Sequence, residues 1–243
     1  MAARKRLDAL LVERGLAKDR EEARLLIAGQ RVLVNGTYAG KGATRVLADC
    51  RLELEQRKTY VSRGGDKLAA GLAHFAVDPA GWICADVGCS TGGFTDCLLQ
   101  HGAARVYSVD VGYGVLDWTL RSDERVVVRE RTNARYLTEQ EIPEPLDLGV
   151  IDASFISLHL LLEPLAALFG QEVRIISLVK PQFELPREQV ARGGVVRRRE
   201  LHARAVAMVE EYVRGAGLRC RGVVESPVRG AKGNLEFLMY ITS

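Results

Sequence analysis

Short apolar runs and amphipathic stretches alternate along residues 82–243. The apolar runs have the length of buried strands, and the stretches between them carry apolar residues at helical spacing. The expected strands cover 82–88, 105–112, 125–130, 146–154, 173–180, 218–226 and 234–243, and the clearest helices cover 157–169 and 199–214. This alternation predicts an α/β fold with a doubly wound, mostly parallel sheet. The last strand follows its predecessor after a short loop, so we expect it to be antiparallel.

Residues 1–55 show a different pattern. Apolar residues recur at helical spacing over 4–15, and Asp19 is a good N-cap for a second helix. Asn35-Gly36 is the strongest short signal for a hairpin turn. The expected strands cover 31–38, 44–47 and 51–54. Together these elements predict a small α+β domain ahead of the larger sheet.

The two patterns divide the chain into two expected domains, 1–59 and 66–243. We expect 60–65 to be a linker, because its paired glycines would let the two domains adjust to each other. Within the second domain, 181–198 is a long connection with two prolines. Long loops in compact domains are usually functional or mobile, which makes this connection a candidate for a role beyond linking two elements.

Charge is unevenly distributed between the two parts. The net charge of +3 combines a net +6 over 1–67 with a net −3 over 68–243. A basic N-terminal part fits a polyanionic partner, either nucleic acid or an anionic membrane surface. Charge alone does not choose between these two partners.

Composition argues against several classes of protein. No apolar run reaches the roughly 18–20 residues needed to span a bilayer. The five cysteines form no C-x-x-C pair, which argues against a disulfide framework or a structural zinc site and for a reducing compartment. The four histidines are dispersed without metal-ligand spacing. We therefore expect a cytoplasmic protein that binds no metal and does not act on membranes; its oligomeric state stays open.

The segment DVGCSTGGFTD (86–96) leads from a predicted strand into a helix. Gly88 permits a tight turn and a close approach of the backbone to a ligand. Asp110 ends the next strand, where a carboxylate can accept hydrogen bonds from both ribose hydroxyls of a nucleoside. Nicotinamide cofactors and S-adenosylmethionine both use this device, and the G-x-x-x-G-G spacing favours S-adenosylmethionine. The candidate cofactor-binding residues are Gly88, Ser90, Gly92, Gly93, Asp110 and Asn133.

Four charged residues from distant parts of the chain are expected at one edge of the sheet. Ligands bind outside the carboxyl ends of parallel strands, and Asp152 and Lys180 each end one of them. An antiparallel last strand begins at the same edge and brings Glu236 there. Lys67 lies in the first turn of a helix that starts beside that edge. Each residue alone could be an ordinary turn or surface residue, but their convergence indicates a shared site.

The stretch RLDALLVERGLAKDREEARLLIAGQRVLVNG (6–36) resembles the RNA-binding module first known from ribosomal protein S-four. This resemblance implies that the second helix and the following turn face structured RNA. It places phosphate contacts at Arg6, Arg20, Arg24 and Arg31. Guanidinium groups on a rigid helical face suit phosphate geometry, and such contacts make binding dependent on salt.

The set Lys67, Asp152, Lys180 and Glu236, in this order, resembles the catalytic tetrad of FtsJ-like ribose 2′-O-methyltransferases. YVSRGGDKL, DVGCSTGGFTD, VDVGYG, ERTNAR, DASFISL, VKPQFE and GNLEF resemble blocks of the TlyA family, also called hemolysin A, over nearly the whole chain. The resemblance implies a Rossmann-like class I methyltransferase sheet and S-adenosylmethionine as cofactor. It also implies that the substrate is the 2′-OH of cytidine in 16S ribosomal RNA, 23S ribosomal RNA or both; the nucleotide and the ribosomal subunit stay open.

In this interpretation Lys180 orients and deprotonates the ribose 2′-OH, while Asp152 and Glu236 hold the two lysines in register. Three rival hypotheses remain. A nicotinamide-dependent oxidoreductase would share the sheet and Asp110 but would not explain the paired lysines. A membrane-lytic protein is suggested by the hemolysin name, but the sequence contains no strongly amphipathic lytic helix. A non-catalytic ribosome-binding factor would not need the tetrad.

Overall fold

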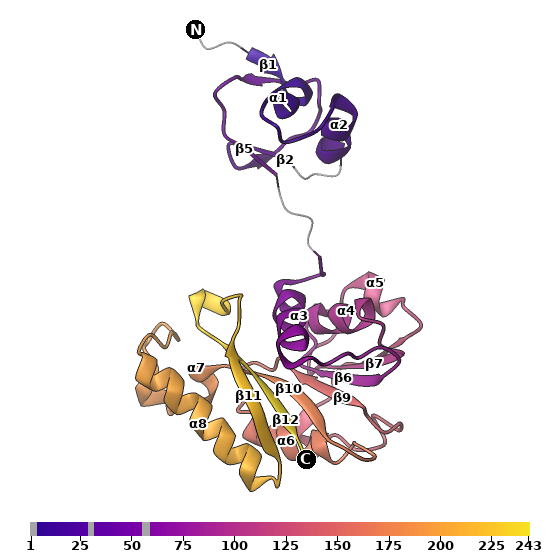
Figure 1. The fold of residues 1–243 in the computed structure, drawn as a ribbon, viewed down its shortest axis with the longest axis vertical. Coiled ribbons are helices and arrows are strands. Elements are labelled where there is room, and N and C mark those ends of the chain that lie inside the picture. Colours follow the sequence, from indigo (N-terminus) through magenta and orange to yellow (C-terminus); the bar gives the residue numbers. More distant parts are fainter. Residues whose placement is uncertain (1–3, 29–31, 55–58) are drawn as a thin grey trace. The chain divides into compact units, whose positions relative to one another are not determined.

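The structure, a computed structural model, describes residues 4–28, 32–54 and 59–243. The chain forms two compact units, Met1–Lys58 and Thr59–Ser243 (Figure 1). The first unit contains two helices and a hairpin, and the second contains a large open sheet. Among the described residues, no helix is both long enough and apolar enough to cross a membrane.

The first unit packs two short helices with two small antiparallel sheets. β1 pairs with β4, and β2 lies between β3 and β5. The elements are β1 (Arg4–Arg6), α1 (Leu7–Glu13), α2 (Arg20–Ala28), β2 (Val32–Val34), β3 (Thr37–Tyr38), β4 (Arg45–Leu47) and β5 (Leu52–Leu54). Our expectation that Arg4–Arg6 belongs to the first helix is wrong, because these residues form ladder hydrogen bonds with Arg45–Leu47 instead.

The start of α2 follows from its local sequence. Asp19 Oδ1 accepts a hydrogen bond from the Glu22 backbone N–H (2.8 Å), and the Glu22 carboxylate accepts one from the Lys18 backbone N–H (2.7 Å). The first bond satisfies an N–H group that the helix itself leaves without a partner, and the second holds the residue before the N-cap against the first turn. Ala23 and Ile27 then lie on the buried face of the helix. The predicted N-cap is therefore confirmed.

The second unit contains a seven-stranded sheet in the order β11-β12-β10-β9-β6-β7-β8. Its strands are β6 (Ile83–Val87), β7 (Arg105–Val109), β8 (Val126–Arg129), β9 (Leu148–Ile151), β10 (Arg174–Val179), β11 (Arg219–Glu225) and β12 (Phe237–Thr242). The pairs from β10 across to β8 are parallel, whereas β12 is antiparallel to both β10 and β11. The predicted α/β fold with an antiparallel last strand is confirmed.

Helices cover both faces of this sheet (Figure 1). One face carries α3 (Arg63–Phe75), α4 (Gly93–Gln100) and α5 (Trp118–Arg121), and the other carries α6 (His159–Ala166) and α8 (Arg199–Gly215). The connections contain α7 (Pro181–Glu184) and the 3-10 turns η1 (Ala134–Tyr136), η2 (Arg187–Gln189) and η3 (Ala231–Gly233). Successive residues of one strand, such as Ile175 and Ile176, enter different cores, as a doubly wound sheet requires.

The segment 60–65, which we expected to be a linker, is folded into the second unit. Ser62 caps α3 by accepting a hydrogen bond from the Gly64 backbone N–H (3.2 Å). Gly65 lies so close to the buried Tyr60 that a Cβ at this position would be 2.1 Å from Tyr60 Cγ. The paired glycines therefore permit close packing in the first turn of a helix, and they do not form a hinge there.

Candidate active site

A cavity of about 330 Å³ lies beyond the carboxyl ends of the central parallel strands, where α/β sheets bind ligands. Lys67 enters it from α3, and Glu236 enters it from the residue before β12. Asp152 and Lys180 follow β9 and β10 directly. All four residues that topology predicted to converge therefore line one cavity, which we name the tetrad cavity.

The four residues form two ion pairs. Lys67 Nζ lies 2.6 Å from Glu236 Oε2, and Lys180 Nζ lies 2.6 Å from Asp152 Oδ1. The Asp152 side chain is 22% exposed, whereas the other three are at most 10% exposed. Taking charges out of water is costly even when they are paired. Stability alone therefore does not explain two such pairs in one cavity wall.

Lys180 is held by more than its ion pair. Its Nζ also donates hydrogen bonds to Ser154 Oγ (3.0 Å) and to the backbone oxygen of Asp152 (3.2 Å). These acceptors belong to the segment that follows β9. The amine is therefore fixed in position at the cavity wall, which is what a group that must meet a reacting atom requires.

A second cavity of about 780 Å³, which we name the large cavity, adjoins the first. This volume lies within the range of small-molecule sites. The residues that line both cavities are Gly88, Ser90, Asp152, Ser154 and Phe155. Four of the predicted cofactor-binding residues line the large cavity, namely Gly88, Ser90, Asp110 and Asn133.

Backbone geometry shapes the wall between the cavities. Gly88 has a φ of +84°, and a Cβ there would lie 2.9 Å from the Cα of Ala153, so glycine is needed at this position. The Asp110 carboxylate accepts hydrogen bonds from the backbone N–H groups of Ser90 (2.8 Å) and Gly112 (2.7 Å). Each of its oxygens still has a lone pair for a ligand hydroxyl.

Gly92 and Gly93 do not line the large cavity. Gly92 is the N-cap of α4 at a φ of 95°, and a Cβ there would lie 2.3 Å from Leu120 Cδ1. Gly93 lines the tetrad cavity, and a Cβ there would lie 2.2 Å from Ser62 Oγ. Both glycines permit close packing around the start of α4; their contact with a cofactor stays a prediction.

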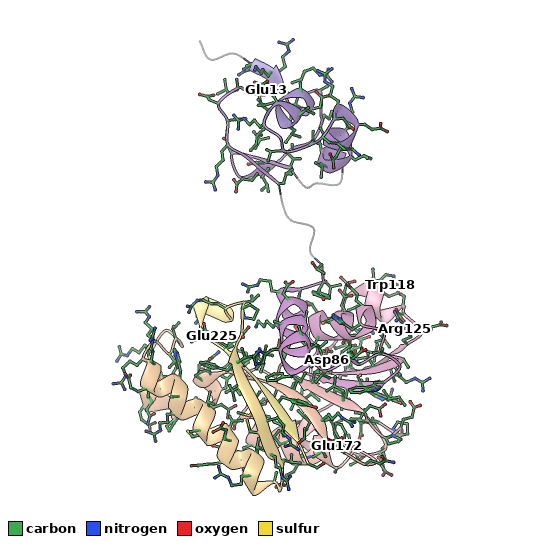
Figure 2. The ribbon with its side chains drawn as sticks, viewed as in Figure 1. Glu13, Asp86, Trp118, Arg125, Glu172 and Glu225 are labelled. Carbon is green, nitrogen blue, oxygen red and sulfur yellow. The ribbon has the colours of Figure 1, made fainter. Side chains whose placement is uncertain are left out.

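Asp86, which the sequence analysis did not select, lies in β6, one position before its end (Figure 2). It is fully buried and lines the tetrad cavity. Its Oδ2 accepts hydrogen bonds from the backbone N–H (2.9 Å) and the hydroxyl (2.7 Å) of Thr95. Its Oδ1 has no partner among the described residues. Burial raises the pKa of Asp86 to about 7, and the negative charges of Asp152 and Asp110 act in the same direction. Its position two residues before Gly88, at the end of a predicted strand, could have marked Asp86 as a site residue in the sequence.

Replacing Asp86 by Asn should stabilise the protein at alkaline pH. The folded protein keeps the Asp86 proton up to a pKa of about 7, whereas an unfolded Asp ionises near pH 4, so stability falls as pH rises between these values. Asn cannot ionise and keeps an oxygen for Thr95. We expect the free energy of unfolding at pH 8 to rise by about 1–3 kcal/mol. Urea unfolding without cofactor at pH 5 and pH 8 tests this, and an equal effect at both pH values contradicts it.

Phe155 was also missed by the sequence analysis. Its side chain is 91% exposed, lines both cavities and lies 5.1 Å from the Phe183 ring between centroids. Its φ of +64° is strained for an aromatic residue. The buried Glu184 carboxylate fixes the segment by accepting hydrogen bonds from Ser157 Oγ (2.7 Å) and the Leu158 backbone N–H (3.0 Å). A strained, exposed aromatic held at a cavity mouth suggests a functional role.

In the first unit, Arg6 and Arg24 line a cavity of about 390 Å³. Both pair with the fully buried Asp8, at 2.7 Å and 3.4 Å. The Arg6 guanidinium lowers the pKa of Asp8 to about 2. Arg20 is exposed at the start of α2, and Arg31 lies outside the described residues.

Comparison with known families decides the identity of the second unit. Residues 60–242 match the model of the FtsJ-like methyltransferases. The chain belongs to this family of enzymes. The same methyltransferase matches the S4 domain over residues 5–49, in its first unit.

Two relatives cover almost the whole methyltransferase. It is 46% identical to the 16S/23S rRNA (cytidine-2′-O)-methyltransferase TlyA of Mycobacterium tuberculosis, over 99% of its own length and 91% of the relative. It is 36% identical to Hemolysin A of Brachyspira hyodysenteriae, over 97% of its own length and 98% of the relative. The chain is also similar to the solved structure of a protein from Streptococcus thermophilus that is named as a hemolysin. The match covers 100% of this chain and 90% of that protein, at 37% identity and a TM-score of 0.76. The resemblance to the TlyA family is confirmed.

Proposed function

We propose that this methyltransferase uses S-adenosylmethionine to methylate the 2′-OH of cytidine in ribosomal RNA. One observation carries the proposal: the cavity with two lysine–carboxylate pairs, in each of which the lysine is buried, shares a wall with a cavity large enough for a nucleoside cofactor. A hydroxyl acceptor in the first cavity and a methyl donor in the second can thus meet beside the lysines. The name of the Mycobacterium tuberculosis relative supports this substrate.

The residues of the large cavity fit S-adenosylmethionine. Asp110 offers carboxylate lone pairs to ribose hydroxyls, and the apolar side chains of Leu160 and Leu161 offer a surface for adenine near Asn133. The partnerless Oδ1 of Asp86 offers a buried acceptor on the adjoining wall for a cationic group. When bound, the cofactor supplies a methyl group that is activated by attachment to a sulfonium.

The tetrad supplies the proton chemistry. A ribose 2′-OH must lose its proton as its oxygen is methylated, and Lys180 Nζ can accept that proton once it has released its own proton to solvent. Asp152 fixes Lys180 through the 2.6 Å pair, and Glu236 fixes Lys67 in the same way. Lys67 adds a positive charge beside the oxygen that becomes negative during the reaction.

The first unit supplies affinity for RNA. Arg6, Arg20 and Arg24, together with Arg31, are our candidates for phosphate contacts, and the S4-domain match supports this role. Lys41 adds a further charge at the cavity beside Arg6 and Arg24. Such contacts give orientation and salt-dependent affinity without reading bases. Because ribosomal subunits are cytoplasmic, we propose that the enzyme acts in the cytoplasm.

We propose that the target base, after it flips out of its RNA helix, stacks on the side chain of Phe155. Stacking on an aromatic side chain contributes about 1–3 kcal/mol per base. We therefore expect Phe155→Ala to lower kcat/KM by about 10–100-fold, and Phe155→Trp to retain most activity. Affinity for S-adenosylhomocysteine, measured by calorimetry, should stay unchanged. Equal kcat/KM values for the Ala variant and the unchanged enzyme contradict the assignment.

The decisive experiment is methylation of purified 30S and 50S subunits with radiolabelled cofactor, followed by mapping of the modified ribose. We expect label on a cytidine 2′-oxygen. Calorimetry with S-adenosylhomocysteine and with NAD separates this proposal from an oxidoreductase. We expect S-adenosylhomocysteine to bind and NAD not to bind. Absence of label from both subunits would overturn the proposal.

A further inference from the structure

A cluster of exposed arginines surrounds the connection that leads into α8. Within 187–204 the sequence has six arginines but only Glu188 and Glu200 as acidic residues, in a part of the chain (68–243) whose net charge is −3. We define the basic rim as Arg187, Arg192, Arg197, Arg198, Arg199 and Arg229, all exposed. In the part of the chain that the structure describes, none of these six forms an ion pair with a carboxylate.

The basic rim is tied to the turn that carries Glu236. The Asn234 side chain accepts a hydrogen bond from the Val196 backbone N–H (3.0 Å) and donates one to the Gly194 backbone oxygen (2.8 Å). Lys232 Nζ donates a further hydrogen bond to the Gly193 backbone oxygen (3.1 Å). Figure 1 shows the connection before α8 beside the turn between β11 and β12. These hydrogen bonds fix the backbone of the rim against the turn that leads directly to Glu236 of the tetrad.

The same turn packs directly against the tetrad. Gly230 lies so close to Glu236 that a Cβ at this position would be 1.7 Å from Glu236 Oε1. Arg229 of the rim immediately precedes this glycine. At the other end, Arg187 follows Lys180 by seven positions, across α7. The rim thus begins and ends next to elements that position the catalytic lysines.

We propose that the basic rim is a second RNA-binding surface, which takes the phosphate backbone of the ribosomal RNA that flanks the target ribose. This inference rests on the proposed function, because it names how the catalytic unit itself grips the same substrate. Guanidinium groups on a fixed backbone match phosphate oxygens, and each phosphate neutralised releases counterions. The first unit gives affinity elsewhere on the RNA, while the rim adds affinity for the strand that flanks the target ribose.

A membrane surface fits the rim less well. Insertion into a bilayer interface needs large apolar side chains next to the basic ones. Among the described residues with exposed large apolar side chains, none lies within 187–199 or 226–234. The rim therefore offers charge alone, as a surface that binds a sugar–phosphate backbone does.

The test compares two triple variants of the full-length enzyme. The rim variant is Arg197→Gln/Arg198→Gln/Arg199→Gln, and the control is Arg214→Gln/Arg219→Gln/Arg221→Gln, three exposed arginines at and beyond the far end of α8. Both variants remove three positive charges, and α8 separates the sites by about 25 Å. The probe is the ribosomal subunit that the unchanged enzyme methylates. The measurements are KM, kcat, and the slope of log affinity against log salt concentration.

For the rim variant we expect a KM for the subunit at least about tenfold higher and a salt slope smaller by about 2. The control should change neither, and kcat and affinity for S-adenosylhomocysteine should stay the same in both. Equal KM and slope in the two variants overturn the inference. Loss of binding to phosphatidylglycerol vesicles with unchanged RNA binding overturns it in favour of a membrane.

Failure of the proposed function is a separate outcome. It appears as absence of methylation by the unchanged enzyme, before any variant is compared. In that case, filter binding of both variants to purified 30S and 50S subunits still decides the role of the rim. Weaker binding by the rim variant alone supports it, and equal binding by both variants overturns it.

Discussion

Lys180→Ala is expected to lower the single-turnover rate of methyl transfer by about 10²–10⁴-fold while leaving the affinity for S-adenosylhomocysteine intact. Lys180 Nζ is fixed by Asp152 and Ser154 at the wall of the tetrad cavity, so the Ala variant removes the amine from this position. The walls of the large cavity keep their glycine turn and Asp110. Rapid-quench transfer to the ribosomal subunit, with calorimetry for the cofactor product, measures both quantities.

A second variant separates two possible roles of this lysine. Lys180→Arg keeps the positive charge but cannot accept a proton, because a guanidinium stays protonated in proteins. We expect it to be nearly as slow as the Ala variant if Lys180 deprotonates the hydroxyl. Full activity of Lys180→Arg would show that charge alone suffices. Thermal unfolding of both variants checks that the fold is retained.

Lys67→Met is expected to impair both stability and turnover. The change leaves Glu236, 3% exposed, as a buried carboxylate without its cation. Removing one partner of a buried ion pair typically costs about 3–5 kcal/mol. We expect urea unfolding to show a loss of this size and turnover to fall more strongly than cofactor binding.

The double variant Lys67→Met/Glu236→Gln distinguishes a structural from a catalytic pair. It removes both charges, so stability should recover to near that of the unchanged protein. Turnover should stay low, because the positive charge beside the reacting oxygen is still missing. Recovery of turnover along with stability would mean that the pair only supports the fold. Normal stability and turnover of Lys67→Met alone would contradict both roles of Lys67.

The convergence of the tetrad was predictable because topology controls it. Parallel strands deliver their last residues to one edge, and the antiparallel final strand begins at that same edge. This places Asp152, Lys180 and Glu236 together. The partners within the tetrad were not predictable. Lys67 pairs with Glu236 across 169 positions, and that choice depends on side-chain packing, which no local pattern encodes.

Asp86 and the 60–65 segment show two further limits of sequence reasoning. The raised pKa of Asp86 comes from complete burial and from carboxylates on neighbouring strands, so it exists only in the assembled fold. Paired glycines can indicate either flexibility or close packing. Only the position of Tyr60 against Gly65 shows that close packing applies here.

The position of β12 in the sheet determines when the tetrad is completed during synthesis of the chain. This strand is inserted between β10 and β11, both of which precede it in the chain, and it pairs with β10 up to Phe237 opposite Val179. Glu236 therefore reaches Lys67 only after the other six strands of this sheet have been synthesised. A nascent chain, held beside ribosomal RNA of the kind proposed as its substrate, has an incomplete tetrad. The tetrad is thus completed by the strand of this sheet that is synthesised last.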